Sequence, residues 1–180
     1  MPLAYPAGPG PSAPDRVHHA RVRLDRLDAD LLALLVEDAR RSYADLGARV
    51  GLSASAVKRR VDRLREEGAI TGFTVRLDPE ALGWSVEGYV ELYCRISTPP
   101  DAIRAVVSRF PEVVDASTIS GEADALLRIL AADMRHFERV LEQIGAQPFV
   151  ARTKSVLVLS PLLRRPAAPA PRNDPPHSGR

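Results

Sequence analysis

The chain has 180 residues, of which 45% are hydrophobic and 27% are charged, and its formal net charge is +2. This length allows one domain or two small ones, and the composition is that of a globular protein. No apolar run reaches the roughly 20 residues that span a membrane, and a single cysteine excludes a disulfide-stabilised scaffold. The amino terminus has neither the basic nor the apolar region of a secretory signal, so we expect a cytoplasmic protein.

Both ends of the chain are rich in proline. Ten of the 16 prolines lie in the first 14 and the last 15 residues. Segments of this composition bury too little apolar area to offset their conformational entropy. We therefore predict disordered tails over residues 1–20 and 164–180, of which the second is basic.

Residues 21–70 predict three helices. Leucines at helical spacing over residues 27–35 indicate the first helix. Ser42 and Ser53 are suitable N-caps for the second and third helices, and Gly51 suits the end of the second. The short link between the last two helices predicts a helix-turn-helix, winged or plain.

The third of these helices carries a local concentration of positive charge. Residues 53–65 contain five cations and one acidic residue, Asp62. The apolar residues of this segment form a stripe at helical spacing, which leaves most of the cations on the other side. A solvated helix with salt bridges such as Lys58–Asp62 is the alternative, but the preceding helix-turn-helix pattern favours a DNA-binding face.

The position of each side chain along this helix predicts its role. Residues at the start of a recognition helix reach base edges, and arginine, lysine and serine can bond to bases. Arginines farther along contact phosphates, which positions the protein without reading sequence. The residues predicted to contact DNA are Ser53, Ala54, Ser55, Lys58 and Arg59, followed by Arg60 and Arg63 on phosphates.

Residues 71–85 predict the connection between two domains. The pattern predicts a short hinge strand followed by a turn at Asp78-Pro79, and Gly83 is a second hinge signal.

Residues 86–163 alternate between strand and helix patterns in the order βαββαβ, a ferredoxin-like arrangement. The fold class is therefore α+β. Two helices cover only one face of a four-stranded sheet, and the other face carries Tyr89 and Tyr93 among polar residues. We expect this face to pack on a second copy in a homodimer. The predicted strands and helices cover 85–97, 100–110, 113–119, 124–131, 134–144 and 152–160.

The sequence resembles the Lrp/AsnC, or feast/famine, transcriptional regulators over about residues 24–163. GLSASAVKRRVDRLREEGAI (51–70) is similar to their recognition-helix motif, and SGEADALLRI (120–129) is similar to a turn and strand of their sensing domain. The resemblance implies a regulator of promoter DNA that is built from dimers, often assembled into octamers, and modulated by an amino acid bound between dimers.

The resemblance also points to an effector site near the glycine turn of the sensing domain. Backbone N–H groups at such a turn can hold a carboxylate, and an acidic side chain can pair with an α-ammonium group. An ordinary tight turn is the alternative. The implied effector-binding residues are Ser120, Gly121, Glu122, Ala123 and Asp124, with Thr153 and Ser155 on the last strand.

Two other functions remain open at this stage. Siroheme decarboxylases resemble the same family and use histidine and arginine around a tetrapyrrole, but no histidine of this chain falls in a predicted strand. An architectural DNA-binding protein without an effector is the second. No catalytic, metal or cofactor site is predicted, so we expect a transcriptional regulator and not an enzyme.

Overall fold

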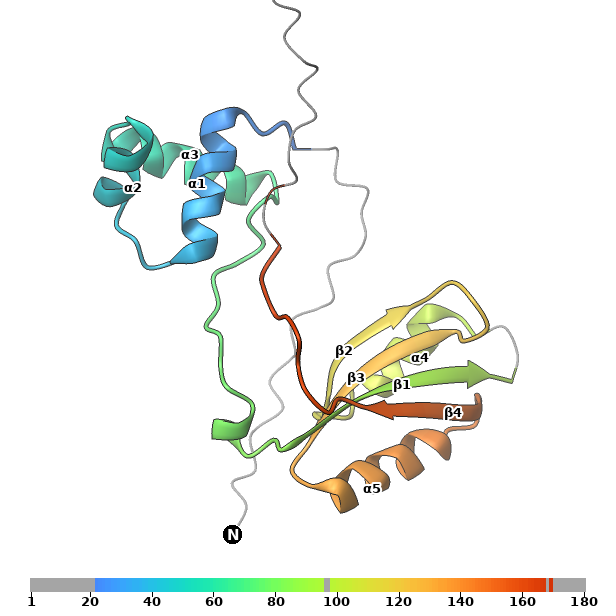
Figure 1. Cartoon of the computed structure of the whole chain (residues 1–180). Helices are drawn as coiled ribbons and strands as arrows, with labels where there is room; N and C mark the ends of the chain where they lie inside the picture. The colour runs from blue at the N-terminus through green and yellow to red at the C-terminus, as the bar shows by residue number, and fades with distance from the viewer. Residues whose placement is uncertain (1–21, 96–97, 168, 170–180) are drawn as a thin grey trace, which may run out of the picture. The chain divides into compact units, whose positions relative to one another are not determined.

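The computed structural model describes residues 22–95, 98–167 and 169. The chain divides into two compact units between Val75 and Arg76, inside the segment expected to connect two domains (Figure 1). The predicted tail 1–20 lies outside the described residues, as does most of the predicted tail 164–180.

The N-terminal unit consists of α1 (Arg26–Glu37), α2 (Tyr43–Val50) and α3 (Ala54–Glu66). Both predicted serine caps are present. The Ser42 hydroxyl accepts from the Asp45 N–H at 3.1 Å, and the Ser53 hydroxyl accepts from the Ala56 N–H at 3.2 Å. These bonds satisfy N–H groups that a helix leaves unpaired at its start, which fixes where α2 and α3 begin.

The turn between α2 and α3 depends on glycine. Gly51 ends α2 in the left-handed conformation, with φ of 71°. A Cβ atom at Gly47 would lie 2.3 Å from the Leu52 carbonyl oxygen, so the turn can fold back on α2 only because that side chain is missing. The predicted helix-turn-helix is thus confirmed. It is the plain form, because residues 22–75 contain no strand that could form a wing.

The core of the N-terminal unit is small. It is built from leucines of α1 and α2 and from the apolar stripe of α3, and each of its central side chains is buried. The central residues are Leu31, Leu35, Leu46, Val57 and Val61.

The hinge strand expected within 71–85 is not formed. Residues 71–77 have no strand structure, and a short 3-10 helix follows at Glu80–Leu82. The alternating Phe73, Val75 and Leu77 are 52%, 73% and 62% exposed. Alternation predicts an extended conformation, but a strand also needs a ladder partner, and no neighbouring segment of the described chain pairs with this one.

The C-terminal unit has the ferredoxin-like order that the sequence predicts. Its four strands form one sheet in the order β2-β3-β1-β4, with antiparallel neighbours throughout. β4 begins two residues earlier and ends three residues earlier than expected, because Val150 already pairs with Cys94 and pairing stops at Leu157. The elements are β1 (Val86–Cys94), α4 (Pro100–Val107), β2 (Val113–Thr118), β3 (Ala125–Ala131), α5 (Met134–Gly145) and β4 (Val150–Leu157).

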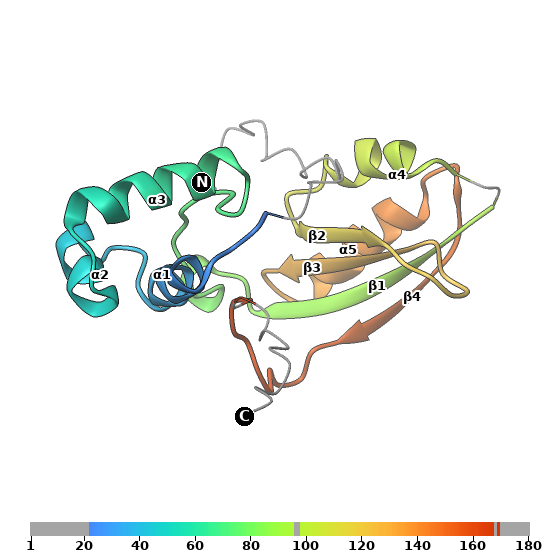
Figure 2. The same cartoon turned by 90° about the horizontal axis from the view of Figure 1, so that it is seen from above.

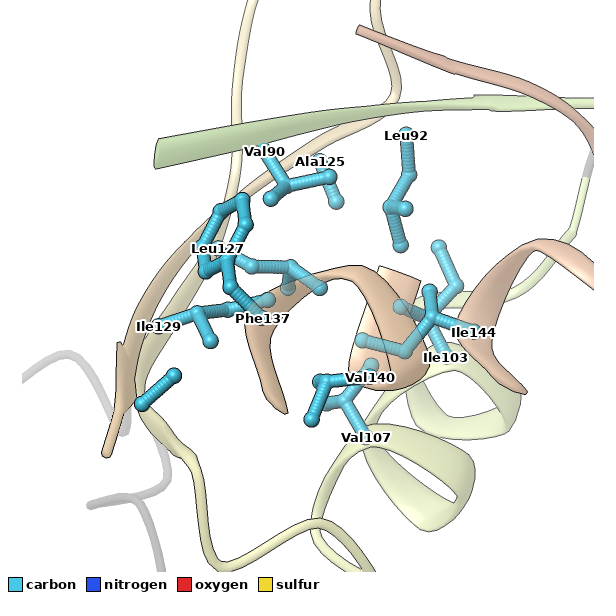
Figure 3. Close-up of a cluster of buried hydrophobic side chains, with 11 residues drawn as sticks. Val90, Leu92, Ile103, Val107, Ala125, Leu127, Ile129, Phe137, Val140 and Ile144 are labelled. Carbon is cyan, nitrogen blue, oxygen red and sulfur yellow. The ribbon is translucent and has the colours of Figure 1, made fainter. Parts of the chain in front are cut away.

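Both helices of this unit cover the same face of the sheet (Figures 1 and 2). Figure 3 shows the side chains of α4 and α5 meeting those of β1 and β3 in one apolar cluster. Leu92, Leu127 and Ile129 are completely buried there. The opposite face is left without a cover from this unit, as the two-helix argument predicts.

Candidate nucleic-acid interface

The outward side of α3 carries exposed cations. Ser55, Lys58, Arg59 and Asp62 follow one another at helical spacing, on the side opposite the buried stripe. The Lys58 ammonium donates to the Asp62 carboxylate at 2.7 Å, and this hydrogen bond raises the pKa of Lys58. Within the part of the chain that the structure describes, Arg59 forms no ion pair. Its guanidinium therefore keeps all its donors for an outside partner.

The start of α3 presents neutral hydrogen-bonding groups. Ser53, Ala54 and Ser55 are all exposed, and the hydroxyls of Ser53 and Ser55 lie 3.0 Å apart. The amino end of a helix also carries partial positive charge, which favours an approaching anion. Five of the seven predicted DNA-contacting residues are thus brought together on one accessible surface.

Arg60 and Arg63 are placed differently. Arg60 Nη1 lies 2.6 Å from Asp25 Oδ2 and 2.8 Å from Asp28 Oδ1, and Arg63 Nη2 lies 2.6 Å from Asp28 Oδ2. Asp28 is completely buried. Sequence analysis missed this carboxylate because it lies 32 and 35 residues from its arginines along the chain.

The predicted effector turn joins β2 to β3. Gly121 has φ of +131°, which disfavours a side chain at this position. Ser120, Gly121 and Glu122 are exposed, whereas Ala123 is buried. Glu122 and Asp124 are both exposed acidic residues of this turn.

Asp124 is part of the sheet end. Its carboxylate accepts from the Cys94 N–H at 2.7 Å, and its own N–H donates to the Leu92 carbonyl at 2.9 Å. The first bond gives the Cys94 N–H a partner at the point where the register of β1 and β4 shifts, between Tyr93 and Cys94. One face of this carboxylate is therefore already engaged with the backbone.

Thr153 and Ser155 lie on β4, on the same side of the sheet as the helices. Thr153 is opposite Leu92, which is itself opposite Ala125 at the start of β3. Neighbouring strands are about 4.8 Å apart, so roughly 10 Å of sheet separates Thr153 from the end of the turn. The two predicted parts of the effector site share one end of the sheet but are not in contact within a chain.

Two features are absent from the described residues. No group of three or more His, Cys, Asp or Glu side chains is arranged to hold a metal ion. No described helix is both long enough and apolar enough to cross a membrane.

Comparison with known proteins decides the family. The AsnC-type helix-turn-helix domain matches residues 24–65, and the Lrp/AsnC ligand binding domain matches residues 88–168. The chain is 50% identical over 143 residues to the HTH-type transcriptional regulator Rv2324 of Mycobacterium tuberculosis, which covers 79% of this chain and 97% of that relative. The chain belongs to the Lrp/AsnC family of transcriptional regulators. The resemblance found in the sequence is confirmed.

Solved structures of Lrp/AsnC regulators have the same fold. The feast or famine regulatory protein of M. tuberculosis, solved in complex with L-methionine, is 32% identical with a TM-score of 0.76, covering 82% of this chain and all of that one. The regulator NMB0573 of Neisseria meningitidis, also an L-methionine complex, is 28% identical with a TM-score of 0.76 and covers 82% of this chain and 97% of that one. This chain is accordingly a transcriptional regulator of the Lrp/AsnC type.

Proposed function

We propose that this Lrp/AsnC regulator recognises specific sequences in double-stranded promoter DNA through the outward side of α3. The observation that carries the proposal is Arg59, an exposed guanidinium without an ion pair in the described structure, in the first half of α3. An arginine in this position can bond to guanine O6 and N7 in the major groove. Ser53, Ala54, Ser55 and Lys58 complete the proposed contact surface.

The test uses the full chain and two duplexes, the DNA upstream of its own gene and a scrambled version of it. Six to ten phosphate contacts reduce affinity by roughly 10³–10⁵ between about 50 and 200 mM salt. Arg59→Ala should lower the ratio of affinities for the two duplexes about 5- to 150-fold, the value of one good bidentate contact. Arg104→Ala, in the other unit, is the control and should leave the ratio unchanged.

Two results of this measurement would count against the proposal. Equal binding of the parent to both duplexes would favour an architectural DNA-binding protein. Retention of the parental ratio by Arg59→Ala would remove the proposed reading helix. The relatives reported above are named as regulators, which favours this function over a decarboxylase-like enzyme.

We further propose that a second copy covers the open face of the sheet. Two ion pairs lie on this face, Arg128 at 2.8 Å from Glu87 and Lys154 at 3.5 Å from Glu91, and the Arg152 guanidinium stacks on the Tyr93 ring. Between the two ion pairs, Tyr89 is 36% exposed, and Val156, directly opposite it on β4, is 56% exposed. A surface with internal ion pairs and exposed apolar groups suits a partner with the same surface, as in a two-fold dimer.

The exposed segment 71–77 gives independent support for the dimer. Its alternating apolar residues lack a ladder partner in the described chain, and the same segment of a second copy could supply one. A two-fold dimer would place two copies of α3 in successive major grooves, about 10–10.5 bp apart. Assembly of dimers into octamers extends this proposal.

Light scattering of the purified chain tests the dimer. Tyr89→Asp should convert it to a monomer, because a carboxylate would be buried without a partner at the interface. Asp101→Asn, on the exposed start of α4, should leave the mass unchanged. A monomeric parent at concentrations that bind DNA would contradict the proposal.

We propose that an amino acid modulates the assembly by binding near residues 120–124. Two related regulators were solved as L-methionine complexes, which supports an effector of this class. The backbone N–H groups of this exposed turn could hold a carboxylate, and Glu122 could pair with an ammonium group. Thr153 and Ser155 would act from β4, and the effector would shift the population between assemblies.

Calorimetry with each of the common amino acids tests the effector. Glu122→Gln should abolish the heat of binding, and Glu138→Gln, an exposed acid on α5, should not. No heat from any amino acid with the parent would remove this part of the proposal. Because its proposed partner is promoter DNA, we place the protein in the cytoplasm.

A further inference from the structure

The flank of α3 that faces α1 is held by charge as well as by apolar packing. The buried Asp28 carboxylate accepts three hydrogen bonds: from the Asp25 N–H at 2.9 Å, from Arg60 at 2.8 Å and from Arg63 at 2.6 Å. Among the described residues it is the one polar or charged side chain that is buried. We call Asp25, Asp28, Arg60 and Arg63 the α1–α3 network.

The α1 side of this network is rigid. Asp25 is the N-cap of α1, and its carboxylate accepts from the Asp28 N–H at 2.8 Å while Asp28 bonds back to the Asp25 N–H. This reciprocal capping box fixes both carboxylates at the first turn of the helix. Asp25 then bonds to Arg60 as well, at 2.6 Å.

The α3 side of the network has two attachment points. Arg60 and Arg63 are three residues apart and therefore lie on adjacent turns of the same helix flank. Two bonds from one fixed carboxylate to adjacent turns define both the rotation of α3 about its axis and its position along that axis. The rotation decides in which direction the outward residues Ser55, Lys58 and Arg59 point.

The network leaves little charge for an outside anion. Its two guanidiniums and two carboxylates sum to zero. The Arg60 side chain is only 27% exposed. The Arg63 side chain is 41% exposed, but its Nε is buried and has no hydrogen-bond partner among the described residues, so a phosphate cannot reach that edge of its guanidinium.

We propose that Asp28 is a positioning residue for DNA recognition, and that Arg60 and Arg63 act through it and not on phosphates. This inference rests on the proposed function of α3. It assigns sequence discrimination to the outward side of the helix and the orientation of that side to a carboxylate one helix away. The two roles can be separated by salt dependence and by the ratio of specific to scrambled affinity.

The first experiment measures the salt dependence of binding by full-length Arg63→Gln. Loss of a phosphate contact lowers the slope of log affinity against log salt by about 0.9 per contact. We expect the parental slope and a ratio of affinities about 5- to 150-fold lower, because Arg59 is misplaced. A lower slope would show a direct phosphate contact, and an unchanged slope with an unchanged ratio would show no role at all; either overturns the proposal.

The second experiment compares two aspartates that each bond to a cation of α3. Asp28→Asn and Asp62→Asn change the net charge equally. Asp62→Asn frees Lys58 on the outward side, so it should raise affinity for both duplexes and keep their ratio. Asp28→Asn should lower the ratio about 5- to 150-fold. If both substitutions act alike, net charge explains binding and the positioning role is wrong.

Folding is controlled separately. Binding is measured below the unfolding transition of each variant, as followed by circular dichroism, because a purely structural role would leave the ratio of the folded protein unchanged. If Asp28→Asn does not fold, the test rests on Arg63→Gln, because in that variant Asp28 still has its ion pair with Arg60. Equal binding of the parent to both duplexes would instead be a failure of the proposed function, and the parent's own data reveal it.

Discussion

The two units of the molecule differ in where their charged side chains lie. The N-terminal unit, with its small core, buries Asp28 completely and bonds it to two arginines. The core cluster of the C-terminal unit is apolar, and the pair Glu91–Lys154 lies on the open sheet face with side chains 32% and 60% exposed. A charge that is buried and fully bonded defines geometry, whereas an exposed pair is available to a partner.

The largest expected effect comes from breaking the buried network. Asp28→Ala leaves Arg63 without its partner and Arg60 with Asp25 alone. Breaking this pair should cost about 3 kcal/mol of folding free energy, the lower end for a buried ion pair, because both guanidiniums are partly exposed. Urea unfolding followed by the helical circular dichroism signal should show this loss. The fluorescence of Trp84, which stacks on His136 in the C-terminal unit, should keep its midpoint. Equal shifts of both signals would mean that the two units unfold together.

In the C-terminal unit, a comparable loss of folding free energy is expected when a cavity is made in the apolar core. Leu127 is completely buried at the centre of the cluster in Figure 3. Leu127→Ala should cost about 2–5 kcal/mol, from lost apolar burial and the cavity that remains. The Trp84 fluorescence transition should move to lower urea, and only the part of the helical signal that comes from α4 and α5 should move with it. A shift confined to the helical signal would contradict the assignment of Trp84 as a reporter of this unit.

Acid provides a smaller perturbation of the N-terminal unit. The N–H of Asp28 and the guanidinium of Arg60 lower the pKa of Asp25 from its usual 3.8. A lowered pKa in the folded state contributes stability above about pH 4, which is lost as the pH falls through the folded-state value. Thermal unfolding between about pH 5 and 3 should therefore show a weaker acid dependence for Asp25→Asn than for the parent. An identical dependence would show that this carboxylate is not linked to folding.

The smallest expected effect is at an exposed ion pair. Arg104 lies 2.6 Å from Asp101 on α4, with side chains 55% and 83% exposed. Water screens such a pair, and holding both side chains costs entropy, so Arg104→Ala should not change the unfolding midpoint measurably. A clear destabilisation would show that exposed pairs matter more in this chain than the comparison of the two units implies.

Local signals in the sequence were sufficient for most of the fold. Ser42, Ser53 and Gly51 act on groups within a few residues, so the boundaries of α2 and α3 could be predicted. Strand alternation likewise predicted the ferredoxin-like order. The segment 71–77 has the local pattern of a strand, but no segment of the described chain pairs with it.

In the candidate sites, too, the sequence predicts local features but not contacts between residues far apart in the chain. The exposure of Lys58 and Arg59 follows from helical spacing alone, and the sequence predicts it. The bonds of Arg63 to Asp28 and of Asp124 to the Cys94 backbone join residues 35 and 30 positions apart, and spacing carries no information about them. Three acidic residues close to the start of α1, before a basic α3, were the only sequence signal for the α1–α3 network.

The most direct test of the DNA-binding account is a crosslink from α3 to the bases. Cys94 is the only cysteine of the chain, so Cys94→Ser allows a photoreactive group to be placed at Ser55→Cys or, as a control, at Asp101→Cys. The account predicts that the Ser55 position crosslinks to bases of the upstream duplex, more than to the scrambled duplex, and that the Asp101 position does not. Equal crosslinking from both positions, or none from Ser55, would contradict recognition through the outward side of α3.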